Sequence, residues 1–315
     1  MIYPRQLIIE ATSRCNLFCE GCYRSQGEVS DVTMSLGVFA HIVDQLTWEP
    51  KPLVCPTSHG EPLLDPEFDI KLSYLADHGH RVDFATNGTI LREGIFHVLA
   101  KYPKMLHRVI VSLDGLYEGT RSIMRHYPAG LIGKPIEFVG HLLSMRRSGS
   151  LPDSFDIAVS LVKNGQDTQE VEDFIRHWLT RGVDMVLVRN LLSSEPQVSP
   201  TPKSHCHFID GWIMTVDANG FARLCDRYMP GANTFLGDTR ERSVLELFNE
   251  GVGEYRDGFP HGLCRSCPQP YSGNGIHGEV TFKKNGFTCF YSADYFHSIF
   301  SMKNVKGGLS WGKPE

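Results

Sequence analysis

The chain has 315 residues, of which 41% are hydrophobic and 21% charged, a composition typical of a globular protein. Its 31 basic and 36 acidic residues give a formal net charge of −5, so we expect neither nucleic acid nor an anionic membrane as a partner. No apolar run reaches membrane-spanning length, and the N-terminus lacks the features of a signal peptide. Nine cysteines without an export signal therefore favour metal chemistry in a reducing cytoplasm over a disulfide scaffold.

Short apolar runs alternate with amphipathic segments from residue 6 to about residue 190. The runs predict six strands, at Gln6–Ala11, Leu53–Pro56, Arg81–Ala85, Arg108–Leu113, Asp156–Val162 and Met185–Arg189. The segments between them predict helices near Ser35–Leu46, Pro66–His78, Leu91–Lys101, Ile136–Arg147 and Thr168–Arg181. This β-then-α alternation predicts a parallel sheet covered by helices, in either a doubly wound sheet or a barrel. Unusual residues cluster just after the strands, which is where a barrel places its chemistry.

The first predicted strand leads into three cysteines, Cys15, Cys19 and Cys22. A structural zinc site needs four ligands, and one disulfide would leave a cysteine over. Three thiolates on a [4Fe–4S] cluster leave one iron open to a small molecule. A zinc loop completed by a distant ligand, or cysteines that only fill the core, are the alternatives.

This Cys-x-x-x-Cys-x-x-Cys loop resembles the signature of the radical S-adenosylmethionine (SAM) enzymes. The resemblance implies that the amino and carboxylate groups of SAM chelate the open iron. It also implies that the reduced cluster splits SAM into methionine and a 5′-deoxyadenosyl radical, which takes a hydrogen atom from a substrate. An external one-electron donor, such as flavodoxin or ferredoxin, follows as a partner. The fold that it implies is an α/β partial (β/α)6 TIM-like barrel, which we assign to residues 1–195.

Later strand ends are similar to segments that line the SAM site in this family. The segment Ser58–Leu64 looks like the family's Gly-Gly-Glu-Pro, which implies that Gly60 and Glu61 help to hold the SAM amino group. His59 departs from the pattern, because it replaces the first glycine. The resemblance implies further SAM contacts after the third, fourth and fifth strands, at Asn87, Ser112, Asp114 and Ser160, with Lys163 as a SAM or substrate contact.

Asn87 and Asp114 also fit a purely structural interpretation, since each precedes a glycine, and Asn-Gly and Asp-Gly pairs form turns that cap helices. The family often carries an aromatic residue before the third cysteine, where this chain has Gly21. Tyr23 follows that cysteine and is our candidate to cover the adenine, although the residue in that role stays open.

Three residues are candidates for contact with the substrate. Arg189 ends the sixth strand and is expected either to anchor a substrate group or to close the barrel rim with an ion pair. Cys55 and Cys289 both fit a buried apolar environment. In a radical SAM epimerase a thiol would donate a hydrogen atom to the substrate radical, and either Cys55 or Cys289 is a candidate for that role.

The alternation stops at a linker over residues 196–204, which is rich in proline and serine. Beyond it, apolar runs at Trp212–Val216 and Phe221–Leu224 flank Asp217-Ala218-Asn219-Gly220, which predicts a β-hairpin. A helix is expected at Ser243–Asn249. Four cysteines accompany these elements: Cys206, Cys225, Cys264 and Cys267.

This pattern resembles the C-terminal extension called SPASM, or twitch in its shorter form. The resemblance implies a small α+β domain over residues 205–315 that binds one auxiliary [4Fe–4S] cluster. A four-thiolate zinc site is the alternative.

The chain is similar in this respect to twitch-bearing dehydrogenases of aminocyclitol biosynthesis. We therefore expect an oxidoreductase that oxidises a small polar intermediate and passes an electron to the auxiliary cluster. Epimerisation and modification of a short ribosomal peptide are alternatives of the same class. Because the chain opens directly with its first strand, we expect no N-terminal peptide-recognition domain. A non-catalytic metal-binding protein is the alternative from another class.

Overall fold

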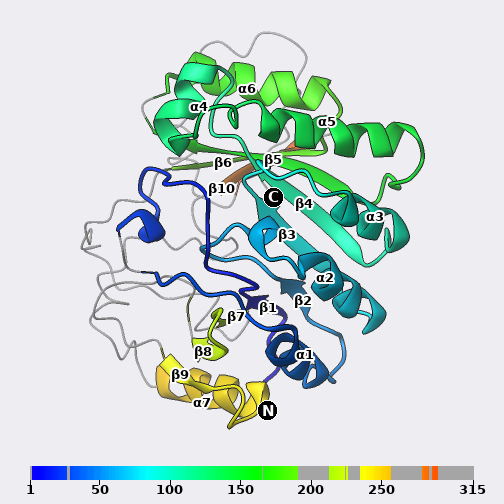
Figure 1. Ribbon diagram of the computed structural model, residues 1–315, viewed down its shortest axis with the longest axis vertical. Coiled ribbons are helices and arrows are strands. Elements are labelled where there is room, and N and C mark those ends of the chain that lie inside the picture. The colour runs from blue at the N-terminus through cyan, green and yellow to red at the C-terminus, as the bar shows by residue number, and fades with distance from the viewer. Residues whose placement is uncertain are drawn as a thin grey trace.

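A computed structural model describes residues 2–26, 29–164, 166–190, 213–223, 225, 235–256, 279–283 and 286–289 (Figure 1). Its strands form one eleven-stranded sheet in the order β11-β10-β6-β5-β4-β3-β2-β1-β7-β8-β9. The six central strands are parallel and confirm the predicted ones: β1 (Gln6–Ile9), β2 (Leu53–Cys55), β3 (Val82–Thr86), β4 (Leu106–Ser112), β5 (Asp156–Lys163) and β6 (Met185–Asn190). The parallel arrangement with crossing helices confirms the expected partial-barrel fold.

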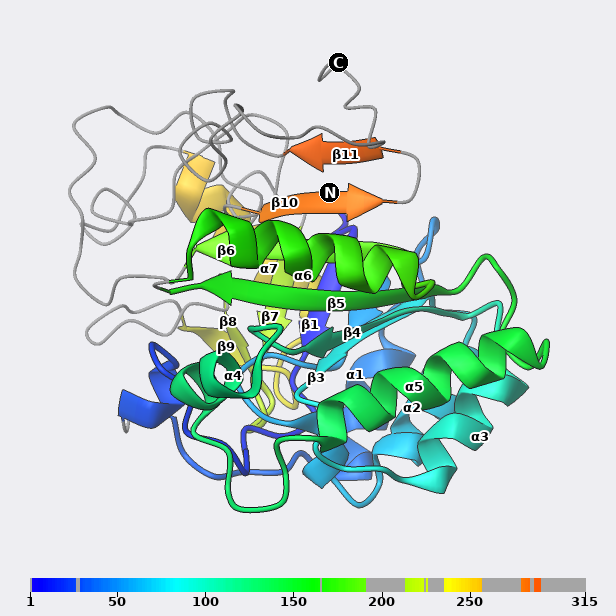
Figure 2. The ribbon, with the colours of Figure 1, turned by 90° about the horizontal axis from the view of Figure 1, so that it is seen from above.

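The predicted helices are present and lie along one face of the sheet (Figures 1 and 2). They are α1 (Leu36–Asp44), α2 (Phe68–Asp77), α3 (Glu93–Lys101), α5 (Lys134–Arg147) and α6 (Thr168–Thr180). Ser35 and Asp167 cap the first turns of α1 and α6, because their side chains accept hydrogen bonds from backbone N–H groups. The sequence did not predict α4 (Glu118–Arg125) or the 3-10 helices η1 (Tyr23–Gln26) and η2 (Pro62–Leu64).

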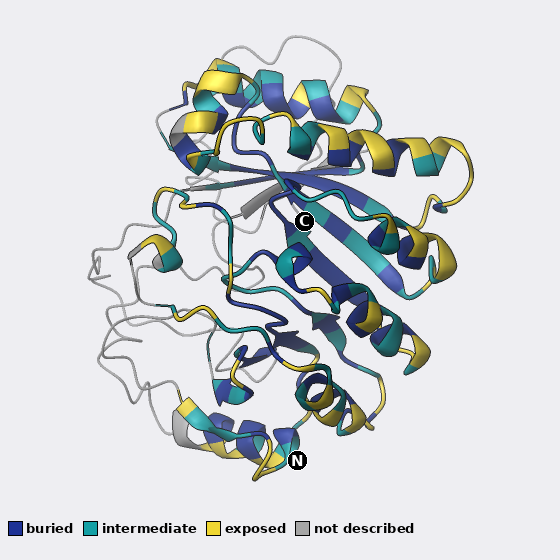
Figure 3. Ribbon diagram, viewed as in Figure 1, coloured by how far each residue is buried: buried dark blue, intermediate teal, exposed yellow. Residues whose placement is uncertain are grey.

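The main hydrophobic core lies between the sheet and these helices (Figure 3). Val109 and Val111 of β4 and Val159 of β5 are fully buried there. Because side chains alternate along a strand, the intervening residues face the opposite, inner side of the sheet. Ile110 and Ala158 belong to a separate, smaller apolar cluster on that side.

The C-terminal segment adds strands to both edges of the parallel sheet. At one edge, β7 (Ile213–Val216) pairs in parallel with β1, and β8 (Phe221–Arg223) and β9 (Phe235–Asp238) continue antiparallel. At the other edge, β10 (Glu279–Lys283) pairs antiparallel with β6 and with β11 (Gly286–Cys289). The predicted hairpin is therefore confirmed as β7–β8, but its pairing with β1 was not predicted.

The turn of this hairpin depends on Gly220, whose φ of +85° lies in the left-handed region. The predicted helix extends further than expected, as α7 (Val244–Arg256), and its residues Leu247 and Phe248 are fully buried in the main core. The division into residues 1–195, 196–204 and 205–315 stays a prediction. None of the helices among the described residues is both long and apolar enough to cross a membrane.

Candidate active site

The cysteine loop leaves the end of β1 and is fixed by backbone contacts. Ser13 N donates to Val32 O at 2.9 Å, and Thr12 forms a β-bridge with Thr33. Arg24 lies behind the loop, where it donates to Ser13 O at 3.1 Å and Cys15 O at 3.4 Å. These bonds join residues near the cysteines to the chain that follows them, so the loop has a defined shape.

The three cysteines of the loop are partly buried and lie within each other's electrostatic influence. Burial raises the pKa of Cys19 to about 11, although the charge of Arg125 opposes the shift. Burial also raises the pKa of Cys15. Within the described part of the chain, no three histidine, cysteine or carboxylate side chains converge as the ligands of one metal ion would. The raised pKa values of Cys15 and Cys19 mean that binding a metal there must displace their protons.

Two nitrogen donors point at sulfur atoms of the loop. Asn87 Nδ2 lies 3.9 Å from Cys15 Sγ, and Arg125 Nη1 lies 3.6 Å from Cys19 Sγ. Asn87 is held by Asn16, whose Oδ1 accepts a hydrogen bond from Asn87 Nδ2 at 2.9 Å. Donors of this kind favour negative charge on sulfur, so the surroundings of Cys15 and Cys19 fit a metal-bound thiolate.

Sequence reasoning missed Arg125. It ends α4, and its Nε and Nη2 both reach Asp114 Oδ2, whereas Nη1 faces Cys19; Asp114 is 2% exposed. Asp114 Oδ1 accepts a second bond from Val162 N at 2.8 Å. Asp114 therefore links β4 and β5 and fixes Arg125 against Cys19. Only the position of Arg125 at the end of a short charged segment marks it in the sequence.

The segment Ser58–Leu64 packs directly against the cysteine loop. Glu61 N donates to Arg14 O at 2.7 Å. A Cβ atom on Gly60 would lie 2.0 Å from Thr12 O, so only glycine fits there. Gly60 and Glu61, which were predicted as SAM contacts, therefore lie directly against the start of the cysteine loop.

Glu61 is buried, and its carboxylate is bonded within the protein. Oε1 accepts from Thr86 Oγ1 at 2.7 Å and Leu63 N at 3.1 Å, and Oε2 accepts from Asn87 N at 2.6 Å. Burial raises the pKa of Glu61 to about 7, although these hydrogen bonds oppose the rise. Glu61 therefore connects the turn after β2 to the end of β3, where Asn87 lies.

Two other predicted residues meet at the ends of β4 and β5. Ser160 pairs with Ser112 in register, and the Ser160 hydroxyl donates to Ser112 Oγ at 3.3 Å. Arg189 lies opposite Val162 on β6, on the same inner face. The fold thus places these three side chains together on the inner face.

The remaining predicted residues are less fully described. Cys225 follows β8 and packs with Cys55 against Ile8 and Ile213. The backbone of Cys289 lies in the edge strand β11, and that of Tyr23 lies in η1. Cys206, Cys264 and Cys267, the other three cysteines predicted for the second cluster, lie outside the described residues.

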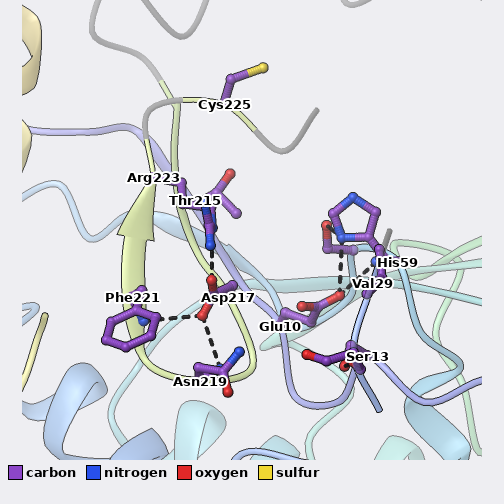
Figure 4. A pocket seen from close by; sticks show the side chains of 12 residues that line it. Glu10, Ser13, Val29, His59, Thr215, Asp217, Asn219, Phe221, Arg223 and Cys225 are labelled. Atoms are coloured by element: carbon purple, nitrogen blue, oxygen red, sulfur yellow. Dashed lines mark hydrogen bonds and ion pairs between the residues drawn. The ribbon is translucent and has the colours of Figure 1, made fainter. Parts of the chain in front are cut away.

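A cavity of about 160 Å³ lies between the cysteine loop, the turn after β2 and the β7–β8 hairpin (Figure 4). Glu10, His59 and Thr215 line it. The backbone N of His59 donates to Glu10 Oε1 at 2.8 Å, and His59 Nδ1 lies 3.3 Å from the same oxygen. Sequence reasoning missed Glu10, since it looks like an ordinary residue at the end of a strand.

Comparisons with known proteins find similar sequences and similar folds. A model of the radical SAM superfamily matches residues 9–132. The tungsten-containing aldehyde ferredoxin oxidoreductase cofactor-modifying protein of Pyrococcus furiosus is 29% identical over 196 residues, which cover 61% of this chain and 53% of that protein. The antilisterial bacteriocin subtilosin biosynthesis protein AlbA of Bacillus subtilis is 30% identical over 113 residues, 36% of this chain and 25% of that protein. The matches thus span about half and a quarter of these relatives.

Solved structures share the fold at low sequence identity. Streptococcus suis SuiB bound to precursor peptide SuiA has a TM-score of 0.64 at 14% identity, over 86% of this chain and 69% of that one. BtrN in complex with AdoMet and 2-DOIA has a TM-score of 0.52 at 16% identity, over 84% and 93%. These likenesses support the architecture of sheet and helices described above.

Proposed function

Because the chain belongs to the radical SAM superfamily, we propose that it cleaves SAM reductively and takes a hydrogen atom from a small polar substrate. The observation that carries this proposal is the loop of Cys15, Cys19 and Cys22, with nitrogen donors aimed at two of its sulfur atoms. Donors to sulfur are of use when the sulfur carries negative charge, as a thiolate on iron does.

In this proposal the three cysteines hold a [4Fe–4S] cluster, which when bound and reduced supplies the electron that breaks a carbon–sulfur bond of SAM. Arg125 and Asn87 stabilise the thiolates of Cys19 and Cys15. Asp114 keeps Arg125 in place, and its own carboxylate is occupied by that role. Asp114 therefore contributes to the site mainly as a positioning residue.

The SAM contacts that we propose are Gly60, Glu61, Asn87, Ser112 and Ser160 at neighbouring strand ends and Tyr23 in η1, whereas Asp114 acts through Arg125. Glu61 accepts three internal hydrogen bonds, whereas a carboxylate has about four acceptor positions. One position on Oε2 thus remains for the SAM amino group. Binding of that cation would favour the ionised form of Glu61, against the effect of its burial.

The reaction that we propose is the oxidation of an alcohol carbon on the substrate, with Arg189 as an anchor at the barrel rim. The substrate radical would lose its hydroxyl proton and pass its electron to an auxiliary [4Fe–4S] cluster, which Cys206, Cys225, Cys264 and Cys267 would hold. Cys225 supports this arrangement, because the pairing of β7 with β1 brings it to the inner face near Ile8. An external one-electron donor would reduce the first cluster.

A second candidate function is the modification of a peptide. Two of the similar proteins favour it, since one is named for subtilosin biosynthesis and the other is bound to a precursor peptide. In that case the same cysteine loop and SAM contacts would act on a peptide side chain or backbone carbon. If the chain is an epimerase instead, Cys55 or Cys289 is the candidate hydrogen donor, and a Cys289→Ala protein with full turnover would exclude Cys289.

The test is anaerobic reconstitution followed by analysis of iron, sulfide and 5′-deoxyadenosine. We expect about eight irons per chain, from two [4Fe–4S] clusters, and deoxyadenosine release after reduction. Cys225→Ala should lower the iron content by about half, because only the auxiliary cluster is lost. A wild-type protein that binds zinc in place of iron and releases no deoxyadenosine would show that the proposal is wrong.

A further inference from the structure

We propose that the cavity beside Glu10 and His59 is the substrate pocket, and that it binds a small hydroxylated molecule that carries no negative charge. This inference rests on the proposed function, because it names the ligand class and the residues that recognise it. Its three supports are the position of the cavity, an unpartnered buried hydroxyl and the charges of the lining.

The cavity lies beside the start of the cysteine loop, on the side of the sheet where β1 and β7 meet. Ser13, two residues before the first cysteine of the loop, forms one wall, and Cys225 forms another. These walls are distant in sequence and meet only because β7 pairs in parallel with β1. A volume of about 160 Å³ has room for roughly five water molecules, or for one molecule of monosaccharide size.

Glu10 and His59 both line the cavity and are joined by a hydrogen bond and a close contact between their side chains (Figure 4). Glu10 is 2% exposed, and its second oxygen, Oε2, accepts from Ala218 N at 3.2 Å. Burial opposes ionisation of Glu10, but the hydrogen bonds and charge of His59 outweigh it and hold the pKa of Glu10 below its ordinary value. The pair therefore presents a carboxylate and an imidazole to the cavity. His59 is also the residue that departs from the glycine of the family pattern.

Thr215 supplies the independent observation that points to a ligand. It is 2% exposed and lines the cavity, opposite Ile8 on β1. Among the described residues, none forms a hydrogen bond with Thr215 Oγ1. Buried hydroxyl groups nearly always have a partner, and one that lacks it costs stability. A hydroxyl or amino group of a bound molecule would satisfy Thr215.

The charges of the lining select against anions. Arg223 lies at the cavity, but its Nε is bonded to Asp217 Oδ2 at 2.7 Å. With Glu10 also charged, the described lining carries two carboxylates against one guanidinium and one histidine. Because Arg223 is paired with Asp217 and His59 with Glu10, neither cationic group is left to balance a phosphate or carboxylate, whereas the lining can accept hydroxyl or ammonium groups.

The experiment is ligand-observed NMR on protein that has been reconstituted with iron and sulfide and saturated with SAM, so that the SAM site is filled. The probes are myo-inositol and glucosamine, with glucose 6-phosphate as the anionic counterpart of glucosamine. We expect wild-type protein to bind the first two and to bind the phosphate more weakly.

The decisive variant is Thr215→Val, which keeps the shape of the side chain and removes only the hydroxyl. We expect the Kd for myo-inositol to rise at least about fivefold, because one hydrogen bond is lost. Without ligand the melting temperature should be equal or higher, since an unpartnered buried hydroxyl is gone. Thr180→Val, at the exposed end of α6, is the matched control and should leave both quantities unchanged.

Glu10→Gln provides a second variant. It removes the charge at nearly constant volume, so we expect glucosamine binding to weaken more than myo-inositol binding. Glu93→Gln, exposed at the start of α3, is its control.

Wild-type protein that binds neither neutral nor cationic probe, or a Thr215→Val protein that binds both as tightly as wild type, would overturn the inference. Tighter binding of glucose 6-phosphate than of glucosamine would overturn the ligand class. The proposed function is judged separately, by deoxyadenosine release from wild-type protein without any probe. SAM cleavage without probe binding would thus reject only the pocket.

Discussion

The two faces of the parallel strands carry different kinds of side chain, although these alternate along the same segments. On the helix-covered face, Val111, Val159 and their neighbours are fully buried in one continuous apolar core. On the inner face, the apolar clusters are small, and Glu10, Ser160 and Thr215 are buried polar residues. The first face contributes the hydrophobic stability of the fold. The second face carries polar groups at a cost in stability, which is typical of a binding site.

The largest effect that we expect is at the cysteine loop, which follows β1. Replacing Cys15, Cys19 or Cys22 by alanine should lower deoxyadenosine formation by more than about a thousandfold, because the protein would lose a ligand of the cluster proposed to cleave SAM. The assay uses anaerobically reconstituted and reduced protein. Cys55→Ala is the matched control, since Cys55 lies on β2 outside the loop and its candidate role concerns the substrate, not SAM cleavage. SAM cleavage that survives in all three loop variants would remove the basis for the proposed function.

The next largest effect concerns Asp114, which follows the end of β4. Asp114→Asn leaves the Arg125 guanidinium without its partner carboxylate, and we expect a loss of about 3–5 kcal/mol in the free energy of unfolding. Urea denaturation measures this loss. The control is Asp238→Asn, whose partner Arg240 is about half exposed, and it should cost less than about 1 kcal/mol. Equal losses of unfolding free energy in the two proteins would mean that the buried Asp114–Arg125 pair is no more costly to break than an exposed pair.

A smaller effect compares the two faces directly. Valine is replaced by threonine on one face and threonine by valine on the other, and the changes in unfolding free energy are compared. Val111→Thr places a hydroxyl in the helix-covered core and should cost about 1–3 kcal/mol in unfolding free energy. Thr215→Val on the inner face should cost nothing or stabilise the protein, since its hydroxyl has no partner among the described residues. Chemical denaturation of the two single variants measures both. If both destabilise the protein equally, the faces do not differ as we describe.

The smallest effect is a pH dependence from Glu61. Burial raises its pKa from 4.5 to about 7, so between these values the folded protein binds more protons than the unfolded chain. Stability should therefore fall as the pH rises through this window, by at most about 1.4 kcal/mol per pH unit. Denaturation of wild type and of Glu61→Gln between about pH 5 and 7 isolates this contribution. An identical slope in both proteins would assign the dependence to other groups.

The sequence by itself determined the parts of this protein that depend on short-range order. Strands and helices follow from hydrophobic periodicity, and the β7–β8 hairpin follows from Asn219-Gly220, because these signals act over a few residues. The cysteine loop was recognisable for the same reason, since its spacing is a local property.

Only the tertiary structure decided which distant residues meet. Arg125 reaches Cys19 across 106 positions, and His59 meets Glu10 across 49. Neither pair leaves a local pattern, because the contacts depend on which strand ends come together. The pairing of β7 with β1 is the clearest case. It brings Thr215 and Cys225 to the cavity beside the cysteine loop, and backbone hydrogen bonds between two strands specify no particular sequence.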